Sequence, residues 1–208
     1  MHEALLRWFP LVCLFGFVAT TLWRLWWLRR HTGVNAMTFE TGDGAHAFLG
    51  RMFKVQVGLT ALYVAARAIW WQDVDGVAGR IASVSALTQA GGGLLQGVAL
   101  SMMAAGVLAM IAGQQNMGLS WRIGVDRERP TDLVTRGLFR YSRNPIFTGV
   151  GAYFIALFLV SPTALTLGIM YAGLVGMAVQ VRLEEEHLGR LHGAAYEDYR
   201  RRVRRWVE

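Results

Sequence analysis

Charged residues are scarce in this chain. Asp, Glu, Lys and Arg make up 17% of its 208 residues, whereas a soluble domain carries about 25%. The apolar residues amount to 54% of the sequence and are gathered in blocks. This composition argues against a soluble globular domain and predicts a membrane protein.

The chain has a single cysteine, and the usual motifs of soluble enzymes are lacking. The single Cys13 lies inside an apolar block, so no intramolecular disulfide can form. The sequence contains no HExxH, P-loop, GxSxG or CxxC motif. Glu184 and His187 form an E-x-x-H pair of the kind that di-iron bundles use, but the second copy that such a site needs is absent. We therefore expect no metal site.

Several apolar blocks approach the roughly 20 residues that a membrane-spanning helix needs. The N-terminal block is followed by arginines and tryptophans and not by a small-x-small cleavage site, so we expect a retained membrane helix. The block 146–181 is nearly twice one span, and Pro162 at its centre favours a break, because a helix tolerates proline best in its first turn. We predict an all-α integral membrane protein with about five transmembrane helices: 8–28, 52–71, 91–113, and a helical hairpin of 146–160 and 163–183.

The segment from residue 182 onward is too polar to span a bilayer. Its apolar residues recur at helical spacing against a charged face, which predicts a cytoplasmic amphipathic helix at the membrane surface. No repeat, low-complexity tract or linker interrupts the sequence. We expect a single domain, 1–208, with three N-terminal spans in 1–113 and a binding loop, the hairpin and the C-terminal helix in 114–208.

Lys and Arg are distributed unevenly between the two predicted sides of the membrane. Segments 24–54, 114–145 and 182–208 hold five, six and seven of them, against three on the opposite side. The positive-inside rule then places the N-terminus outside and the C-terminus in the cytoplasm, as in a protein of a bacterial inner membrane. The net charge of +7 reflects these loops, so we expect no nucleic-acid partner.

Two polar clusters, 132–145 and 182–187, flank the predicted hairpin on the same side. Because a hairpin returns the chain to the side where it began, Asn144 and Glu184 should lie close together. Three consecutive carboxylates near a helix C-terminus oppose the helix dipole and need partners, such as Arg143. The clusters fit either a juxtamembrane salt-bridge network or a site for a ligand that carries both positive and negative groups.

The sequences GLFRYSRNPIFTG (137–149) and RLEEEHLGRLHGAAYEDYRRRV (182–203) resemble the isoprenylcysteine carboxyl methyltransferase family, whose members are integral-membrane enzymes that use S-adenosyl-L-methionine. The family pattern is an Arg-(His/Asn)-Pro corner with flanking Gly and aromatic residues, a helical hairpin, and then E-E-x-x-L, Gly and Y-x-x-Y. It falls on Gly137, Phe139, Arg143, Asn144, Pro145, Phe147, Gly149, Glu184, Glu185, Leu188, Gly193, Tyr196 and Tyr199.

The resemblance implies a cytosolic cofactor pocket beneath the C-terminal helix. The residues implied to bind the cofactor are Thr131, Asp132, Leu133, Val134, Phe139, Asn144, Pro145, Ile146, Phe147 and Glu184. Arg143 and Glu185 are the expected catalytic residues, and Gln180 and Arg182 the expected substrate contacts. A lipophilic or lipidated substrate would enter sideways from the bilayer, so membrane lipids and this substrate are the expected partners.

Two departures from the family bear on the reaction. Asn144 stands where many members have His, and an amide cannot serve as a general base. Gln180 stands where eukaryotic members have an Arg that is thought to meet the substrate carboxylate, and Arg182 points about 200° away on a helix. The acceptor could therefore be a lipid amine, a thiol or a small hydrophobic acid.

Two other classes of function remain open. A membrane NADPH-dependent reductase of the sterol-reductase type has a similar corner, but with an acidic residue where Val150 follows Gly149 here. A non-catalytic membrane protein could keep the same fold.

Overall fold

Helices account for nearly all the regular structure of the protein. The computed structural model describes residues 2–33, 35–38, 44–90, 93–124 and 131–206. The α-helices are α1 (His2–Thr32), α2 (Ala45–Val77), α3 (Ala82–Gln89), α4 (Leu94–Met117), α5 (Pro145–Val160), α6 (Ala164–His192) and α7 (Ala194–Arg202). Short 3-10 helices are η1 (Gly118–Ser120) and η2 (Gly137–Arg140), and the two-residue strands β1 (Met37–Thr38) and β2 (Ile123–Gly124) pair in parallel.

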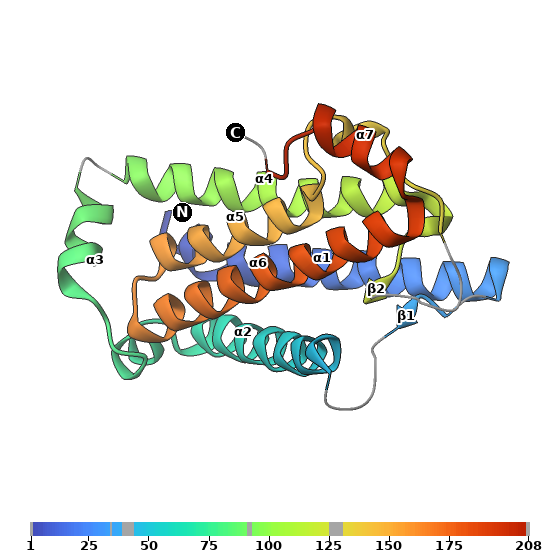
Figure 1. Cartoon of the computed structure of the whole chain (residues 1–208). Helices are drawn as coiled ribbons and strands as arrows, with labels where there is room; N and C mark the ends of the chain where they lie inside the picture. The colour runs from blue at the N-terminus through green and yellow to red at the C-terminus, as the bar shows by residue number, and fades with distance from the viewer. Residues whose placement is uncertain (1, 34, 39–43, 91–92, 125–130, 207–208) are drawn as a thin grey trace.

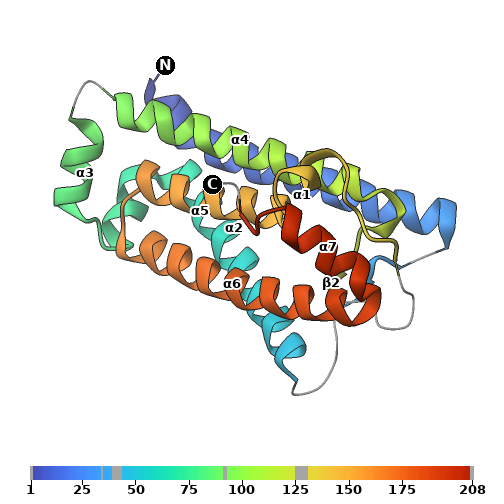
Figure 2. The ribbon, with the colours of Figure 1, turned by 45° about the horizontal axis from the view of Figure 1, so that its top comes forward.

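The long helices α1, α4, α5 and α6 run alongside one another, and α2 packs against them at an oblique angle, as Figures 1 and 2 show. The short helix α3 lies across one end of this bundle, and α7 folds over the other end (Figure 1). The α7 end therefore gathers the loop before α5, the end of α6 and the C-terminal segment. Within the described residues, four helices are long and apolar enough to cross a membrane, namely α1, α2, α4 and α6. This confirms the predicted all-α membrane protein.

The predicted hairpin is confirmed. Helix α5 begins at Pro145, which suits the first helical position because its missing N–H would be unpaired there. Its 16 residues span about 24 Å at 1.5 Å per residue, somewhat less than a bilayer core of about 30 Å. Helix α6 begins after Thr163, whose side chain forms a capping box with Thr166.

Small residues let α5 pack closely against α4. A methyl group added at Gly106 would lie 2.7 Å from the carbonyl oxygen of Gly149 and 3.2 Å from the Cβ atom of Ala152. Such close backbone approach is typical of helix packing in membranes. It fixes the position of Asn144, one residue before the start of α5.

The end of α6 differs from the prediction. The helix does not stop near residue 183 but continues to His192, because Glu, Leu and Arg are strong helix formers. It ends at Gly193, whose φ of +52° suits glycine. The tail is therefore not one amphipathic helix but the last turns of α6 followed by the nine-residue α7. Residues 91–92 of the predicted third span and 125–130 of the predicted binding loop lie outside the described part of the chain.

Candidate functional site

A pocket opens at the α7 end of the bundle, between the loop that precedes α5, the last turns of α6, and α7. Its enclosed volume is about 90 Å³, and its mouth is open to solvent. Nine of the residues expected from the sequence line it: Thr131, Asp132, Leu133, Val134, Phe139, Arg143, Asn144, Glu184 and Glu185.

Five other expected residues are not in the lining of this pocket. Pro145 is buried at the start of α5, Ile146 packs against the small core that contains Trp121, and Phe147 is half-buried. Arg182 is exposed and donates to the carbonyl oxygen of Ala178 at 2.8 Å, as expected from its place on the other side of α6. Gln180 is half-buried one turn before Glu184.

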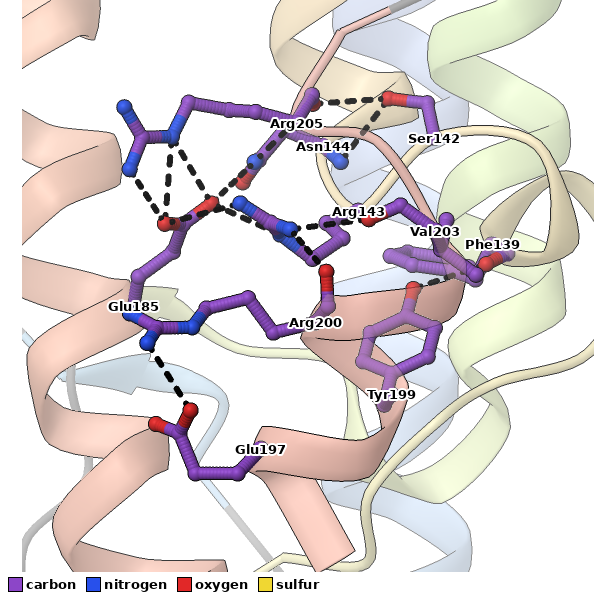
Figure 3. Close-up of polar contacts among 10 residues, drawn as sticks. All are labelled: Phe139, Ser142, Arg143, Asn144, Glu185, Glu197, Tyr199, Arg200, Val203 and Arg205. Atoms are coloured by element: carbon purple, nitrogen blue, oxygen red, sulfur yellow. Dashed lines mark hydrogen bonds and ion pairs between the residues drawn. The ribbon is translucent and has the colours of Figure 1, made fainter.

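The carboxylate of Glu185 is the centre of a polar network (Figure 3). Arg143 donates to it from Nε at 3.1 Å and from Nη2 at 3.3 Å. Arg205 donates from Nη2 at 2.8 Å, and the side-chain amide of Asn144 donates at 3.1 Å. Glu185 is only 8% exposed, so these partners offset the cost of burying its charge. The hydrogen bond to Glu185 raises the pKa of Arg205.

The same loop holds the C-terminal segment by its backbone. Arg143 donates from Nη1 to the carbonyl oxygens of Arg200 at 3.0 Å and Val203 at 2.8 Å, so it pairs carbonyl groups at the end of α7 (Figure 3). The hydroxyl of Ser142 donates to the carbonyl oxygen of Arg205 at 3.0 Å. We call Ser142, Arg143, Asn144, Glu185 and Arg205 the C-terminal clamp. The clamp fixes α7 as a roof over the pocket.

Two tyrosines of α7 reach into the site. The hydroxyl of Tyr199 donates to the carbonyl oxygen of Phe139 at 2.7 Å (Figure 3). Tyr196 is 2% exposed and lines the pocket, yet its hydroxyl has no hydrogen-bond partner among the described residues. Burial raises the pKa of Tyr196 to about 12, so the phenol is a neutral donor at ordinary pH. A buried polar group without a partner suggests a missing ligand.

Glu184 differs from its neighbour in having no partner. Its carboxylate lines the pocket but makes no hydrogen bond or ion pair with another residue in the described ranges. Arg143 and Arg205 are both directed at Glu185. Glu184 therefore offers an unused acceptor in the pocket, and a cationic group of a ligand would stabilise its ionised form.

Eight further residues line the pocket that were not expected to do so: Met117, Ser120, Arg122, His187, Leu188, Leu191, Tyr196 and Tyr199. Leu188, Tyr196 and Tyr199 are positions of the family pattern given above, and helical spacing gave a signal for three of the eight. His187, Leu188 and Leu191 follow Glu184 by three, four and seven residues, so they share its helical face. The position of Arg205 in the clamp had no such signal, because it depends on how the chain turns at Gly193.

Comparison with known proteins agrees with this geometry. Residues 95–195 match the family model described as phospholipid methyltransferase. This region, just under half of the chain, is therefore similar to the phospholipid methyltransferases. The match runs from α4 through the loop and the hairpin to the start of α7, so it includes most of the pocket. It confirms the expected family of integral-membrane methyltransferases. No curated protein and no solved structure matches the chain.

Proposed function

We propose that the protein transfers a methyl group from S-adenosyl-L-methionine to a lipophilic, membrane-embedded acceptor, in the manner of the isoprenylcysteine carboxyl methyltransferases. The observation that carries the proposal is the pair of unpartnered groups in the pocket. The Glu184 carboxylate and the buried Tyr196 hydroxyl have no partner among the described residues, although both line a pocket roofed by α7. The match of residues 95–195 to the phospholipid methyltransferase model supports the same reaction class.

The residues of the pocket fit this cofactor, which supplies an electrophilic methyl group on a sulfonium ion. Glu184 offers a charge-assisted acceptor for the ammonium group. The hydroxyl of Tyr196 offers a hydrogen-bond donor for the carboxylate group of the cofactor. The buried ring of Phe139 offers an aromatic surface for the adenine or for the sulfonium charge. The loop residues Thr131 to Val134 complete the wall opposite α6.

Arg143 and Glu185 act by positioning in this proposal. Their side chains are bonded to each other, and Arg143 also holds backbone carbonyl groups of the C-terminal segment. They keep Asn144 in the wall and α7 over the pocket, which limits the access of water to the site. Methyl transfer is a direct displacement that depends on orientation. The amide of Asn144 does not take up a proton near neutral pH, so no general base is assigned to the corner.

The acceptor is assigned to the side of the pocket nearest the apolar part of α6. Gln180 lies one turn before Glu184, so both face the same side of the helix. A neutral amide at this position suits a polar head without a fixed negative charge, such as a lipid amine or a thiol. The apolar residues of α6 before Gln180 provide a surface for an acyl or prenyl chain in the bilayer.

Calorimetry of the detergent-solubilised protein tests the proposal. We expect S-adenosyl-L-methionine and S-adenosylhomocysteine to bind and NADPH not to bind. Glu186→Gln serves as a matched control, because Glu186 is exposed and bonds only Arg190 of α6 among the described residues. Binding of NADPH alone would identify a reductase, and binding of none of the three would point to a non-catalytic protein.

A further inference from the structure

A second cavity lies at the opposite end of the helices from the pocket under α7. Its volume is about 390 Å³, within the range of about 300–1,000 Å³ that is usual for ligand sites. Residues from the start of α1, the end of α2, α3, the start of α4 and the α5–α6 turn line it. The proposed methyl transfer makes no use of this cavity.

A strained turn brings a buried ion pair into the cavity wall. In a straight helix Arg67 and Asp75 would be about 12 Å apart along the axis. Trp71 interrupts α2 with φ +28° and ψ −97°, which is unusual for a residue other than glycine. The chain turns back there, and Arg67 donates from Nε to the Asp75 carboxylate at 3.1 Å. Backbone strain of this kind is often found at functional sites.

The charged groups in this wall are only partly paired. Arg67 is 2% exposed and donates from Nη1 to the carbonyl oxygen of Leu6 at 2.6 Å. Its Nη2 atom has no hydrogen-bond partner among the described residues, and neither do the Ser85 hydroxyl and the Glu3 carboxylate, which line the same cavity. Arg80 and Asp75 also belong to the lining, so the charges of Arg67 and Arg80 balance those of Glu3 and Asp75. The cavity thus combines cationic donors suited to a phosphate with a carboxylate suited to an amine.

Apolar residues next to the lining are exposed. Val77 is 92% exposed, Leu87 63% and Leu94 72%, and each stands within three residues of a residue that lines the cavity. Trp70, at the end of the apolar part of α2, is 57% exposed, as expected for a tryptophan at a membrane interface. The cavity is therefore at the level of lipid head groups, and its surroundings suit acyl chains.

We infer that this cavity binds a zwitterionic phosphoester head group, with the phosphate at Arg67 and Ser85 and the amine at Glu3, and that its source is a phospholipid of the membrane face opposite the methyl-transfer pocket. Arg67 is pre-set for this role because Asp75 and the carbonyl group of Leu6 fix its guanidinium and leave one edge unused. The site is separate from the proposed reaction and binds lipid without chemical change.

Native mass spectrometry of the detergent-purified full chain tests this inference. The probes are phosphatidylethanolamine, phosphatidylglycerol and diacylglycerol of the same acyl chains. We expect phosphatidylethanolamine to be retained best and diacylglycerol least. Ser85→Leu should lower retention of phosphatidylethanolamine about tenfold, the scale of one lost hydrogen bond to a charged group. Ser83→Leu is the matched control, since Ser83 is exposed on the same helix and is not part of the lining.

Glu3→Gln separates the two parts of the head group. It should reduce the preference for phosphatidylethanolamine over phosphatidylglycerol, because only the former carries the amine. Soluble glycerophosphoethanolamine shows whether the bound head group belongs to a membrane lipid or to a soluble molecule. If it binds more weakly than phosphatidylethanolamine, the ligand is a membrane lipid. If it binds as tightly, the same head-group chemistry comes from a soluble molecule. Equal retention of phosphatidylethanolamine and diacylglycerol, or equal loss in Ser83→Leu and Ser85→Leu, would overturn the inference. Calorimetry with S-adenosyl-L-methionine should be unchanged in all three variants.

Discussion

The clamp at Glu185 should control whether the roof over the pocket stays closed. Glu185→Gln keeps the size of the side chain but removes the charge on which Arg143 and Arg205 converge. The two guanidinium groups then lie side by side without a counter-charge. We expect α7 and the residues after it to open locally while the transmembrane helices remain folded.

The size of the effect follows from the burial of the partners. Breaking a buried ion pair by removing one partner costs about 3–5 kcal/mol. The side chain of Arg143 is 9% exposed and that of Arg205 is 36% exposed, so solvent screens the second interaction and we take a total of about 2–4 kcal/mol. A loss of about 2 kcal/mol alone raises the open population roughly 30-fold.

Limited trypsin digestion measures this opening directly. Five arginines lie between residues 200 and 205, and the docked backbone protects the bonds that follow them. Release of the C-terminal peptide, followed by mass spectrometry, should be at least about 30-fold faster in Glu185→Gln. Glu186→Gln is the control, because it removes only an exposed pair with Arg190, worth about 0.3–0.5 kcal/mol. Equal release rates in the two variants would refute the clamp.

Three further predictions concern the pocket and the helix packing. Glu184→Gln should weaken the binding of S-adenosyl-L-methionine by about 1.5–3 kcal/mol in calorimetry, whereas Glu186→Gln should leave it unchanged. Equal affinities of the two variants would place the ammonium group of the cofactor elsewhere. Tyr196→Phe should lower the affinity for S-adenosyl-L-methionine about 3- to 10-fold. It should also raise the melting temperature of the ligand-free protein, because it removes a buried hydroxyl that has no partner among the described residues. Since the pKa of Tyr196 is about 12, the loss of affinity should be the same at pH 7 and pH 9, and a pH-dependent loss would contradict the assignment. Gly106→Ala should destabilise the protein by about 1–3 kcal/mol, because the added methyl group would lie 2.7 Å from a carbonyl oxygen of α5. Gly97→Ala, in open space on the same helix, should instead stabilise it by up to about 1 kcal/mol in thermal unfolding, and the opposite order would contradict the packing of α4 on α5.

The hairpin was predictable from local signals. A long apolar block with a proline at its centre allows few other structures, and the break falls at 161–162 in the prediction and at 161–163 in the fold. The turn also brings Asn144 beside the carboxylates of α6, as the return of a hairpin requires. These features depend on residues that are close in sequence or on the simple geometry of a helix pair.

The roles of the individual carboxylates were not predictable. Successive residues on a helix point about 100° apart, so the rotation of α6 decides which glutamate meets the loop. The side chain of Asn144 contacts Glu185, whereas the sequence favoured Glu184. The sequence left two alternatives for the polar clusters, and each applies to one carboxylate. Glu185 belongs to a salt-bridge network. Glu184 has no partner among the described residues, as expected of a ligand site.

The roof was also beyond the reach of sequence reasoning. The periodicity of the tail suggested one continuous amphipathic helix, but the positive φ of Gly193 separates α6 from α7. Only after this turn does Arg205 come within hydrogen-bond distance of Glu185, 20 residues earlier in the chain. Such a contact depends on the direction of a single turn, which composition and spacing do not specify.

Photochemical labelling tests most directly whether the pocket beneath α7 holds the cofactor. The full chain would be irradiated with methyl-labelled S-adenosyl-L-methionine in the presence or absence of excess S-adenosylhomocysteine, and the labelled peptides mapped. We predict that label is competed by S-adenosylhomocysteine and falls on segments that line the pocket, either 131–144 or 184–199. Competed label at the opposite end of the bundle, in α3 or the start of α4, would contradict the assignment of this pocket.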